Sequence, residues 1–223
     1  MTTVSSIALH HGGGTANAYY ASSKDLTAPQ VNEAHRTRWA PFAKSWPAYK
    51  SSLGYFGGYN FFIDKFGTLT QFRAIGEETA AQIGSNFDTV SICLAGNFSI
   101  NPKTKEPVDI PTQAQINMLK DVMLALLNKD YHIYGMAVMG MVPIDIKFQN
   151  IHPHRFYQVG TECNGTFLPD NWGQQLIIDH FTAKLNLLQQ LLLKIRLTMG
   201  SLKTFARTPL ERLQGQCEDF AKG

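Results

Sequence analysis

Apolar and polar positions are arranged along the chain in blocks that predict strands first. Residues 4–9 form a short apolar run that ends in two histidines and three glycines, which is typical of a buried strand entering a glycine-rich loop. Residues 90–95 form a second apolar run, in which Cys93 is expected to be plain core. Between them, residues 59–73 contain two β-rich runs separated by Phe66 and Gly67, a pattern that predicts a β-hairpin.

Two further blocks have helical periodicity. Residues 28–39 carry a proline in the first turn, and Val31, His35 and Trp39 recur at four-residue spacing on one face. We expect His35 to point inward, either as a structural residue or as part of a cleft lining. Residues 112–127 open with the capping box Thr-Gln-Ala-Gln and place Ile116, Leu119, Met123 and Leu126 on one stripe. Strands and helices thus alternate within one α/β domain.

The last fifty residues have a different pattern. From Ile178 to Leu202 apolar residues recur at spacings of three and four, and after Gly200 and Ser201 a second capped segment, 208–220, repeats this spacing. The pattern predicts a C-terminal helical hairpin over residues 173–223, following a domain over 1–172. Its apolar faces are expected to pack against each other, against the first domain or against a second copy, which would make a homo-oligomer.

Composition and charge narrow the class of protein. The chain has 223 residues, is 44% hydrophobic and has a net charge of +3. Up to Trp172 the chain has 13 basic residues (Lys+Arg) and 13 acidic residues (Asp+Glu), whereas after it there are 7 basic and 4 acidic residues. The excess positive charge therefore lies in the tail, which could dock on an anionic cell envelope. Three scattered cysteines argue against a disulfide framework. No secretion signal or membrane-spanning run is recognised, so we expect synthesis in the cytoplasm and no stable membrane insertion.

The segment 151–165 is the strongest candidate for chemistry. It is too polar for a core strand and too interrupted for a helix, and it holds three possible soft metal ligands, His152, His154 and Cys163. A thiolate with imidazoles is a set that zinc prefers, although a surface loop with incidental histidines would read the same way. His10 ends the first predicted strand, where it is either a ligand or a histidine bonded to backbone. The glycines after it lack the pattern of a phosphate-binding loop, and nucleic acid is not an expected partner.

In this order the motifs resemble a known family. The matching pieces are I-A-L-H in the first strand, G-Y-N-F-F-I-D-K-F-G-T-L in the hairpin, N-F-D-T-V-S-I-C-L-A-G-N-F in the next strand, P-T-Q-A-Q before the helix and H-R…T-E-C-N-G at the candidate site. Together they resemble the zinc-dependent N-acetylmuramoyl-L-alanine amidases of the phage-lysozyme type, which share a fold with the peptidoglycan-recognition proteins. The resemblance covers roughly residues 4–172 and implies a central mixed β-sheet flanked by helices.

The resemblance also implies roles for individual residues. It places one zinc ion on His10, His154 and Cys163, and it makes Tyr59 and Thr161 active-site hydroxyl donors. The chain departs from the family pattern where His154 lies nine rather than eight residues before Cys163, which leaves His152 as a rival ligand. Arg155 is expected to be a salt-bridging support.

Zinc held by three protein ligands keeps a fourth position for water, whose pKa it lowers to about 7, and it polarises the scissile carbonyl. No general base is assigned, since Glu162 should point away from the site and Glu77 or Glu78 should cap a loop.

Two functions follow from the resemblance. One is a peptidoglycan hydrolase that cleaves the amide bond between N-acetylmuramic acid and L-alanine, acting on the cell wall as a phage or prophage endolysin after release at lysis. The other is a module that binds peptidoglycan without cutting it, as non-catalytic relatives do. Those relatives typically lack the cysteine ligand, so the presence of Cys163 favours the enzyme. A zinc hydrolase acting on another amide is a third reading.

Overall fold

The protein is described by a computed structural model of the chain. The structure describes residues 2–13, 18–82, 84–132, 134–158, 160–163 and 165–199, with side chains up to residue 193. The chain divides into two compact units, Met1–Gly173 and Gln174–Gly223. The candidate site lies in the first unit.

A five-stranded mixed sheet forms the centre of the first unit. The strands are β1 (Ser6–His11), β2 (Phe61–Ile63), β3 (Leu69–Gln71), β4 (Thr89–Leu94) and β5 (Ile151–Pro153). Their order is β3-β2-β4-β1-β5, and all neighbours run parallel except the antiparallel hairpin of β2 and β3. Strand β1 lies between β4 and β5, so every residue of β1 is buried. The predicted strands and the hairpin are confirmed.

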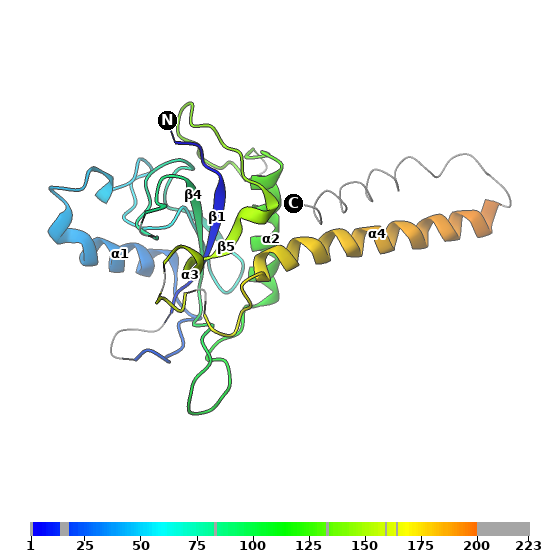
Figure 1. Cartoon of the computed structure of the whole chain (residues 1–223), viewed down its shortest axis with the longest axis horizontal. Coiled ribbons are helices and arrows are strands. Elements are labelled where there is room, and N and C mark those ends of the chain that lie inside the picture. Colours follow the sequence, from blue (N-terminus) through cyan, green and yellow to red (C-terminus); the bar gives the residue numbers. More distant parts are fainter. Residues whose placement is uncertain are drawn as a thin grey trace. The chain divides into compact units, whose positions relative to one another are not determined.

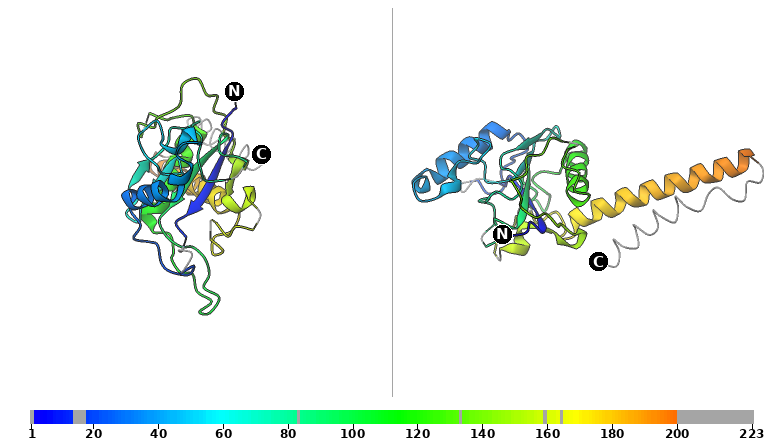
Figure 2. Two further views of the ribbon diagram at one scale, coloured as in Figure 1. Left: turned by 90° about the vertical axis from the view of Figure 1, so that its left-hand side faces the viewer. Right: turned by 90° about the horizontal axis from the view of Figure 1, so that it is seen from above.

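Helices cover both faces of this sheet. Helix α1 (Ala28–Trp39) lies on one side of the strands and α2 (Gln113–Leu127) on the other (Figures 1 and 2). The short elements are η1 (Ala40–Phe42), η2 (Pro47–Tyr49), η3 (Phe148–Asn150) and α3 (His154–Tyr157). The expected mixed sheet flanked by helices is therefore confirmed.

The cap and the buried face of helix α2 largely match the pattern predicted from its sequence. The Thr112 hydroxyl accepts a hydrogen bond from the Gln115 N–H at 3.1 Å, which completes the predicted capping box. Leu119, Met123 and Leu126 of the predicted stripe are buried, whereas Ile116 is only half-buried. Gln115 is buried instead, because its side-chain amide donates to the Ala95 carbonyl at 2.8 Å and thereby ties the helix to the sheet.

The α1 face of the sheet carries a small apolar cluster. Val31 from α1 packs with Phe62, Phe72, Cys93 and Ala95, and Tyr59 lies partly buried against them. Cys93 is thus core, as predicted from the sequence. The candidate site lies on this face of the sheet, beside the cluster.

Two predictions about the segment 151–165 were wrong. It was expected to be too interrupted for a helix, yet His154–Tyr157 forms the short helix α3. Ile151–Pro153 was expected to be too polar for a strand, yet it forms β5 and pairs in parallel with β1. Ile151 and Pro153 are buried while His152 between them is half-buried. Alternation over only three residues is too short to be recognised in a sequence, and pairing to β1 supplies the missing hydrogen bonds.

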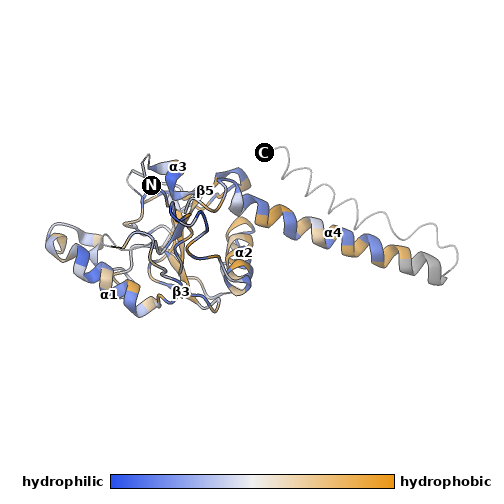
Figure 3. Cartoon of the chain, turned by 90° about the horizontal axis from the view of Figure 1, so that it is seen from below, coloured by the Kyte–Doolittle hydropathy of each residue, from blue (hydrophilic) through white to orange (hydrophobic). Residues whose placement is uncertain are grey.

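The second unit contains most of α4 (Trp172–Met199), a helix of 28 residues whose hydrophobic and hydrophilic positions alternate along its length (Figure 3). Phe181, Leu185, Leu188 and Leu192 of the predicted apolar seam are half-buried. The helix confirms the first arm of the expected hairpin, whereas residues 208–220, including Cys217, lie outside the described residues. Among the helices that the structure describes, none combines the length and apolarity needed to cross a membrane.

Candidate metal centre and active site

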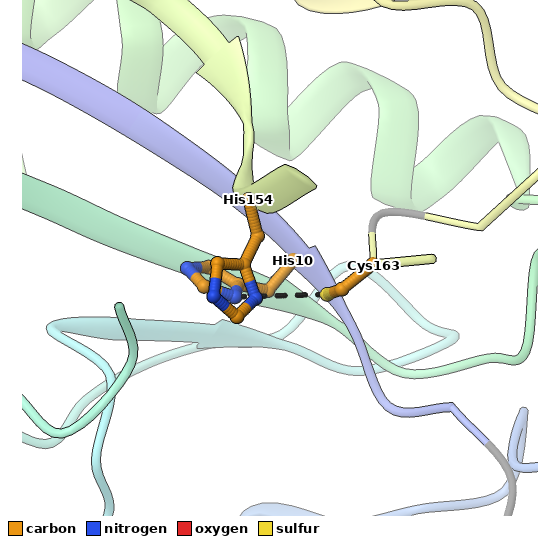
Figure 4. A group of neighbouring side chains, drawn as sticks. All are labelled: His10, His154 and Cys163. Atoms are coloured by element: carbon orange, nitrogen blue, oxygen red, sulfur yellow. Dashed lines mark hydrogen bonds between the residues drawn. The ribbon is translucent and has the colours of Figure 1, made fainter. Parts of the chain in front are cut away.

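Strand register brings the two candidate histidine ligands together. The last paired residues of β1 and β5 are Leu9 and Pro153. The residues that follow them are His10, still within β1, and His154, which begins α3 directly after β5, so the two histidines lie side by side at this end of the strands. The centroids of the two imidazole rings are 4.5 Å apart. Figure 4 shows the two rings close together, His10 on β1 and His154 at the point where β5 passes into α3. Nothing in the local sequence of either histidine encodes this contact, since it depends on the pairing of segments far apart in the chain.

Cys163 completes the cluster from a loop. Its Sγ lies 3.7 Å from His10 Nδ1 and accepts a hydrogen bond from the His11 backbone N–H at 3.5 Å (Figure 4). The ligand atoms of His10, His154 and Cys163 all lie within 4.8 Å of one another. In the described part of the chain no other group of histidine, cysteine or carboxylate side chains is gathered in this way.

The cluster fits a zinc ion in the chemistry of its ligands and, for one pair of them, in spacing. Bonds of about 2.0–2.1 Å to nitrogen and 2.3 Å to sulfur in a tetrahedron put ligand atoms roughly 3.3–3.6 Å apart. The separation of 3.7 Å between His10 Nδ1 and Cys163 Sγ is close to this spacing. Two imidazoles and one thiol also match the borderline-soft character of zinc.

Gln82 orients His10, and no sequence pattern predicts this role. The His10 Nε2 and the Gln82 Oε1 are 3.2 Å apart, and the Ser91 hydroxyl donates to the same Oε1 at 2.9 Å. An amide oxygen only accepts, so the His10 Nε2 carries the proton and its Nδ1 presents a lone pair toward Cys163. Gln82 is a buried glutamine in an irregular segment, and such residues have no pattern by which a sequence distinguishes them.

His154 has an equivalent partner. Its Nε2 lies 3.2 Å from Gln158 Oε1, one helical turn further along the chain. By the same reasoning Nε2 donates, and Nδ1 remains available for a metal. Gln158 was not predicted either, although its spacing of four residues from His154 is a signal that could have found it.

Burial sets the charge of these groups. Desolvation, followed by the neighbouring His154, lowers the pKa of His10 well below its usual value, and desolvation also lowers the pKa of His154. Both imidazoles are therefore neutral at pH 7, as metal ligands must be. Desolvation raises the pKa of Cys163 to about 12, although the His11 N–H and Arg155 act in the opposite direction. The thiol must lose its proton when a metal binds.

Arg155 holds the loop that carries Cys163. Its guanidinium donates to the carbonyls of Gly165 and Leu168, both at 2.7 Å, and to the Asp170 carboxylate at 2.5 Å. Its backbone N–H also donates to the Cys163 carbonyl at 2.7 Å. The expected role of Arg155 as a salt-bridging support is confirmed.

A cavity of about 560 Å³ opens beside the cluster. The three clustered side chains line it together with Tyr59 and Thr161. The Tyr59 ring lies 5.1 Å from the His10 ring, and burial raises the pKa of its hydroxyl, which therefore stays protonated at neutral pH and can donate a hydrogen bond. The Thr161 hydroxyl accepts from the Cys163 N–H at 3.3 Å. The structure thus brings both predicted hydroxyls to the predicted ligands.

The remaining predicted residues lie elsewhere or support the site. The His152 ring stacks on Phe156 with centroids 3.8 Å apart and is not part of the cluster. Glu162 points away, as expected, and accepts from the Tyr19 hydroxyl at 2.9 Å. Glu77 caps a loop by accepting from the N–H and the hydroxyl of Ser52.

His35 is both a structural and a lining residue. Its Nδ1 accepts from the Gly58 N–H at 2.9 Å, and its ring borders the cavity.

Comparison with known proteins gives the family. Residues 1–166 match the family described as N-acetylmuramoyl-L-alanine amidase. Amidase LysC from Clostridium intestinale has 22% identity, coverage of 82% of this chain and 87% of that chain, and a TM-score of 0.48. Endolysin amidase LysCS from the same organism has 22% identity, coverage of 82% of this chain and 85% of that chain, and a TM-score of 0.47. Bumblebee PGRP-SA has 14% identity, coverage of 75% of this chain and 79% of that chain, and a TM-score of 0.48. No curated protein matches. Because the family match spans most of its length, the chain belongs to the N-acetylmuramoyl-L-alanine amidase family.

Proposed function

We propose that this protein hydrolyses the amide bond between N-acetylmuramic acid and L-alanine in peptidoglycan, with one zinc ion held by His10, His154 and Cys163. The observation that carries the proposal is the gathering of these three ligands, within 4.8 Å of one another, on the wall of a cavity of about 560 Å³. A cavity of this size accommodates a short peptide segment next to the ligands. When bound there, zinc would activate a water molecule and polarise the scissile carbonyl.

The protein side chains would do the rest of the chemistry. Gln82 and Gln158 hold the imidazoles in the tautomer that directs Nδ1 toward the metal. Tyr59 and Thr161 donate their hydroxyl protons to the oxygen of the carbonyl as negative charge develops on it. Tyr59 keeps its proton for this task because burial raises its pKa.

The proposal extends to the organisation of the chain. Residues 1–172 form the catalytic domain, and the tail, 173–223, packs, oligomerises or docks on the envelope. The division of the chain after Gly173 supports this assignment. Since peptidoglycan lies outside the cytoplasmic membrane, the protein acts as an endolysin that reaches the wall after release from the cell that makes it.

The test measures bound zinc and the release of new L-alanine amino termini from purified sacculi. Four proteins are compared: the native chain, Cys163→Ala, Tyr59→Phe and Cys93→Ala. We expect the native chain to hold one zinc ion and to release amino termini, and Cys163→Ala to lose both. Tyr59→Phe should keep its zinc and lose about 10² or more in turnover, the usual cost of one oxyanion donor.

Cys93→Ala is the matched control, because Cys93 is the other described cysteine beside the site and packs in the core. It should keep both zinc and hydrolysis. A native protein that binds zinc but releases no amino termini would be a recognition module, and the proposed hydrolysis would be wrong. Hydrolysis that survives in Cys163→Ala would instead exclude the proposed zinc ligands.

A further inference from the structure

The cavity beside the ligand cluster has an asymmetric charge. Among the described residues that line it, Arg38 is the one side chain with a permanent charge, since none of them is an aspartate or glutamate and the histidines have lowered pKa values. Glu78 lines a neighbouring cavity of about 310 Å³ and forms no ion pair with Arg38. The site therefore presents a positive charge to whatever enters.

Arg38 has no described partner for that charge. It is exposed, and no carboxylate or carbonyl of the described residues lies within hydrogen-bonding or ion-pair distance of its guanidinium. Arg36, two residues earlier on α1, behaves differently, because it pairs with Glu33 at 2.5 Å. A guanidinium that borders a reaction cavity without a protein partner is available to a ligand.

The position of Arg38 on α1 directs it to the reacting part of the cavity. It lies three residues after His35 and directly before Trp39, which both line the cavity. Its charge also acts on two other groups that line the cavity. Arg38 contributes to the lowered pKa of His35, after desolvation, and it acts against the raised pKa of Tyr59. Arg38 therefore lies electrostatically close to the proposed oxyanion donor.

The chemistry of the substrate determines which anionic group can meet this arginine. On the glycan side of the scissile bond, the lactyl carboxyl is already consumed by the amide. The carboxylates near this bond therefore belong to the stem peptide, and the first of them is on the second residue. An extended peptide advances about 3.3–3.6 Å per residue, so that carboxylate lies roughly 7 Å from the reacting carbonyl. This reach is compatible with a cavity of about 560 Å³.

We propose that Arg38 binds the free carboxylate on the second residue of the stem peptide and so makes the enzyme prefer peptidoglycan in which this group is not amidated. The inference rests on the function proposed above and adds a specificity to it. Arg38 would form a charge-assisted, bidentate pair with the carboxylate, which a neutral carboxamide cannot reproduce.

The experiment compares two muramoyl dipeptides that differ only in this group, a carboxylate or a carboxamide. The proteins are the native chain, Arg38→Gln and the control Arg36→Gln, which removes the same charge from the same helix outside the cavity. We expect Arg38→Gln to lose about 10–100-fold in kcat/KM on the carboxylate substrate, mainly through KM, and less than about 3-fold on the carboxamide. Arg36→Gln should match the native chain on both.

A binding measurement separates this inference from the proposed function. Titration calorimetry with the two free dipeptides, L-alanyl-D-isoglutamate and its carboxamide, should give a preference for the carboxylate in the native chain that Arg38→Gln abolishes. If the native chain hydrolyses both substrates but Arg38→Gln keeps the native preference, the inference is wrong and the proposed function stands. If Arg38→Gln loses turnover equally on both substrates, Arg38 acts on the transition state and does not read the carboxylate. If nothing is hydrolysed but the binding preference is present, the proposed function fails alone.

Discussion

The three clustered ligands are positioned by two different kinds of structure. His10 and His154 follow paired residues of adjacent parallel strands, so the sheet determines their separation. Cys163 lies in an irregular loop, and side-chain and backbone bonds from Arg155 hold that loop. The first half of the site is a consequence of the fold, whereas the second depends on a few specific interactions.

The two halves also differ in how tightly their surroundings are packed. Leu9 of β1, directly before His10, and Ile151 of β5, three residues before His154, are each 1% exposed. Gly173 lies so close to them that an added Cβ would be 2.6 Å from Leu9 Cδ1 and 2.8 Å from Ile151 Cγ2. In the Cys163 loop, Thr161 and Cys163 are half-buried and Glu162 is exposed, and close packing begins only at Gly165, which is buried against Phe98. We therefore expect substitutions that leave the ligands intact to disturb the loop half more easily.

The largest expected effect of this kind comes from Arg155→Met. The substitution leaves the Gly165 and Leu168 carbonyls and the Asp170 carboxylate without their donor, and it removes a positive charge that lowers the pKa of Cys163. We expect zinc to bind about 10–100-fold more weakly, the usual cost of losing a residue that orients ligands. Competition with a chromogenic chelator measures this change directly.

Asp170→Asn is the matched control. It removes only the ion pair, and the Asp170 side chain is 78% exposed, so solvent screens the interaction. Zinc affinity should stay within about twofold of the native value. Equal losses in both variants would mean that the ion pair, and not the two carbonyl contacts, positions the loop.

Much of this site follows from the sequence because its residues sit at element boundaries. His10 ends an apolar run and Tyr59 opens a hairpin, and both features are visible as local patterns. The resemblance to the amidases then selected His154 and Cys163 as the partners of His10. The helix boundaries were equally accessible, since Pro29 and the capping box at Thr112 mark the first turns of α1 and α2.

What the sequence could not supply are the contacts that depend on tertiary pairing. Strand β5 has three residues, too few for an alternation to be recognised, and its parallel pairing with β1 alone explains why His154 and not His152 joins the cluster. The roles of Gln82 and Arg38 could not be predicted from the sequence for the same reason. Each is an ordinary polar residue in the sequence and becomes informative only when a cavity wall is built around it.

The pH dependence of zinc binding tests whether the two halves of the site, the histidine pair and the Cys163 loop, differ in protonation before zinc binds. Both imidazoles have lowered pKa values and are neutral at pH 7, whereas the Cys163 thiol, with its pKa raised to about 12, is protonated in the metal-free protein. Zinc binding should therefore release one proton, from the loop half alone. The Kd for zinc is expected to fall about tenfold per unit between pH 7 and pH 8.

Calorimetry in buffers with different ionisation enthalpies counts the protons released. A value near one agrees with neutral histidines and a protonated thiol. Two or more would mean that an imidazole is cationic before zinc binds, and a value near zero would mean that Cys163 is already a thiolate. Either result would contradict the electrostatic difference between the two halves.

The smallest effect on the site is expected from removing the tail, because the three ligands and the hydrogen-bond partners described above for them all belong to the unit Met1–Gly173. A chain that ends at Gly173 should bind zinc as the full chain does.

Helix α4 exposes Leu187, Leu191 and Leu193 by 52–66%, and the residues after Trp172 carry the excess positive charge. If the tail docks on the anionic envelope, binding of the full chain to sacculi should weaken with added salt and the shortened chain should bind less. If it pairs two copies, light scattering should give a dimer for the full chain only. A full chain that is monomeric and binds sacculi no better than the shortened one would leave packing as the role of the tail.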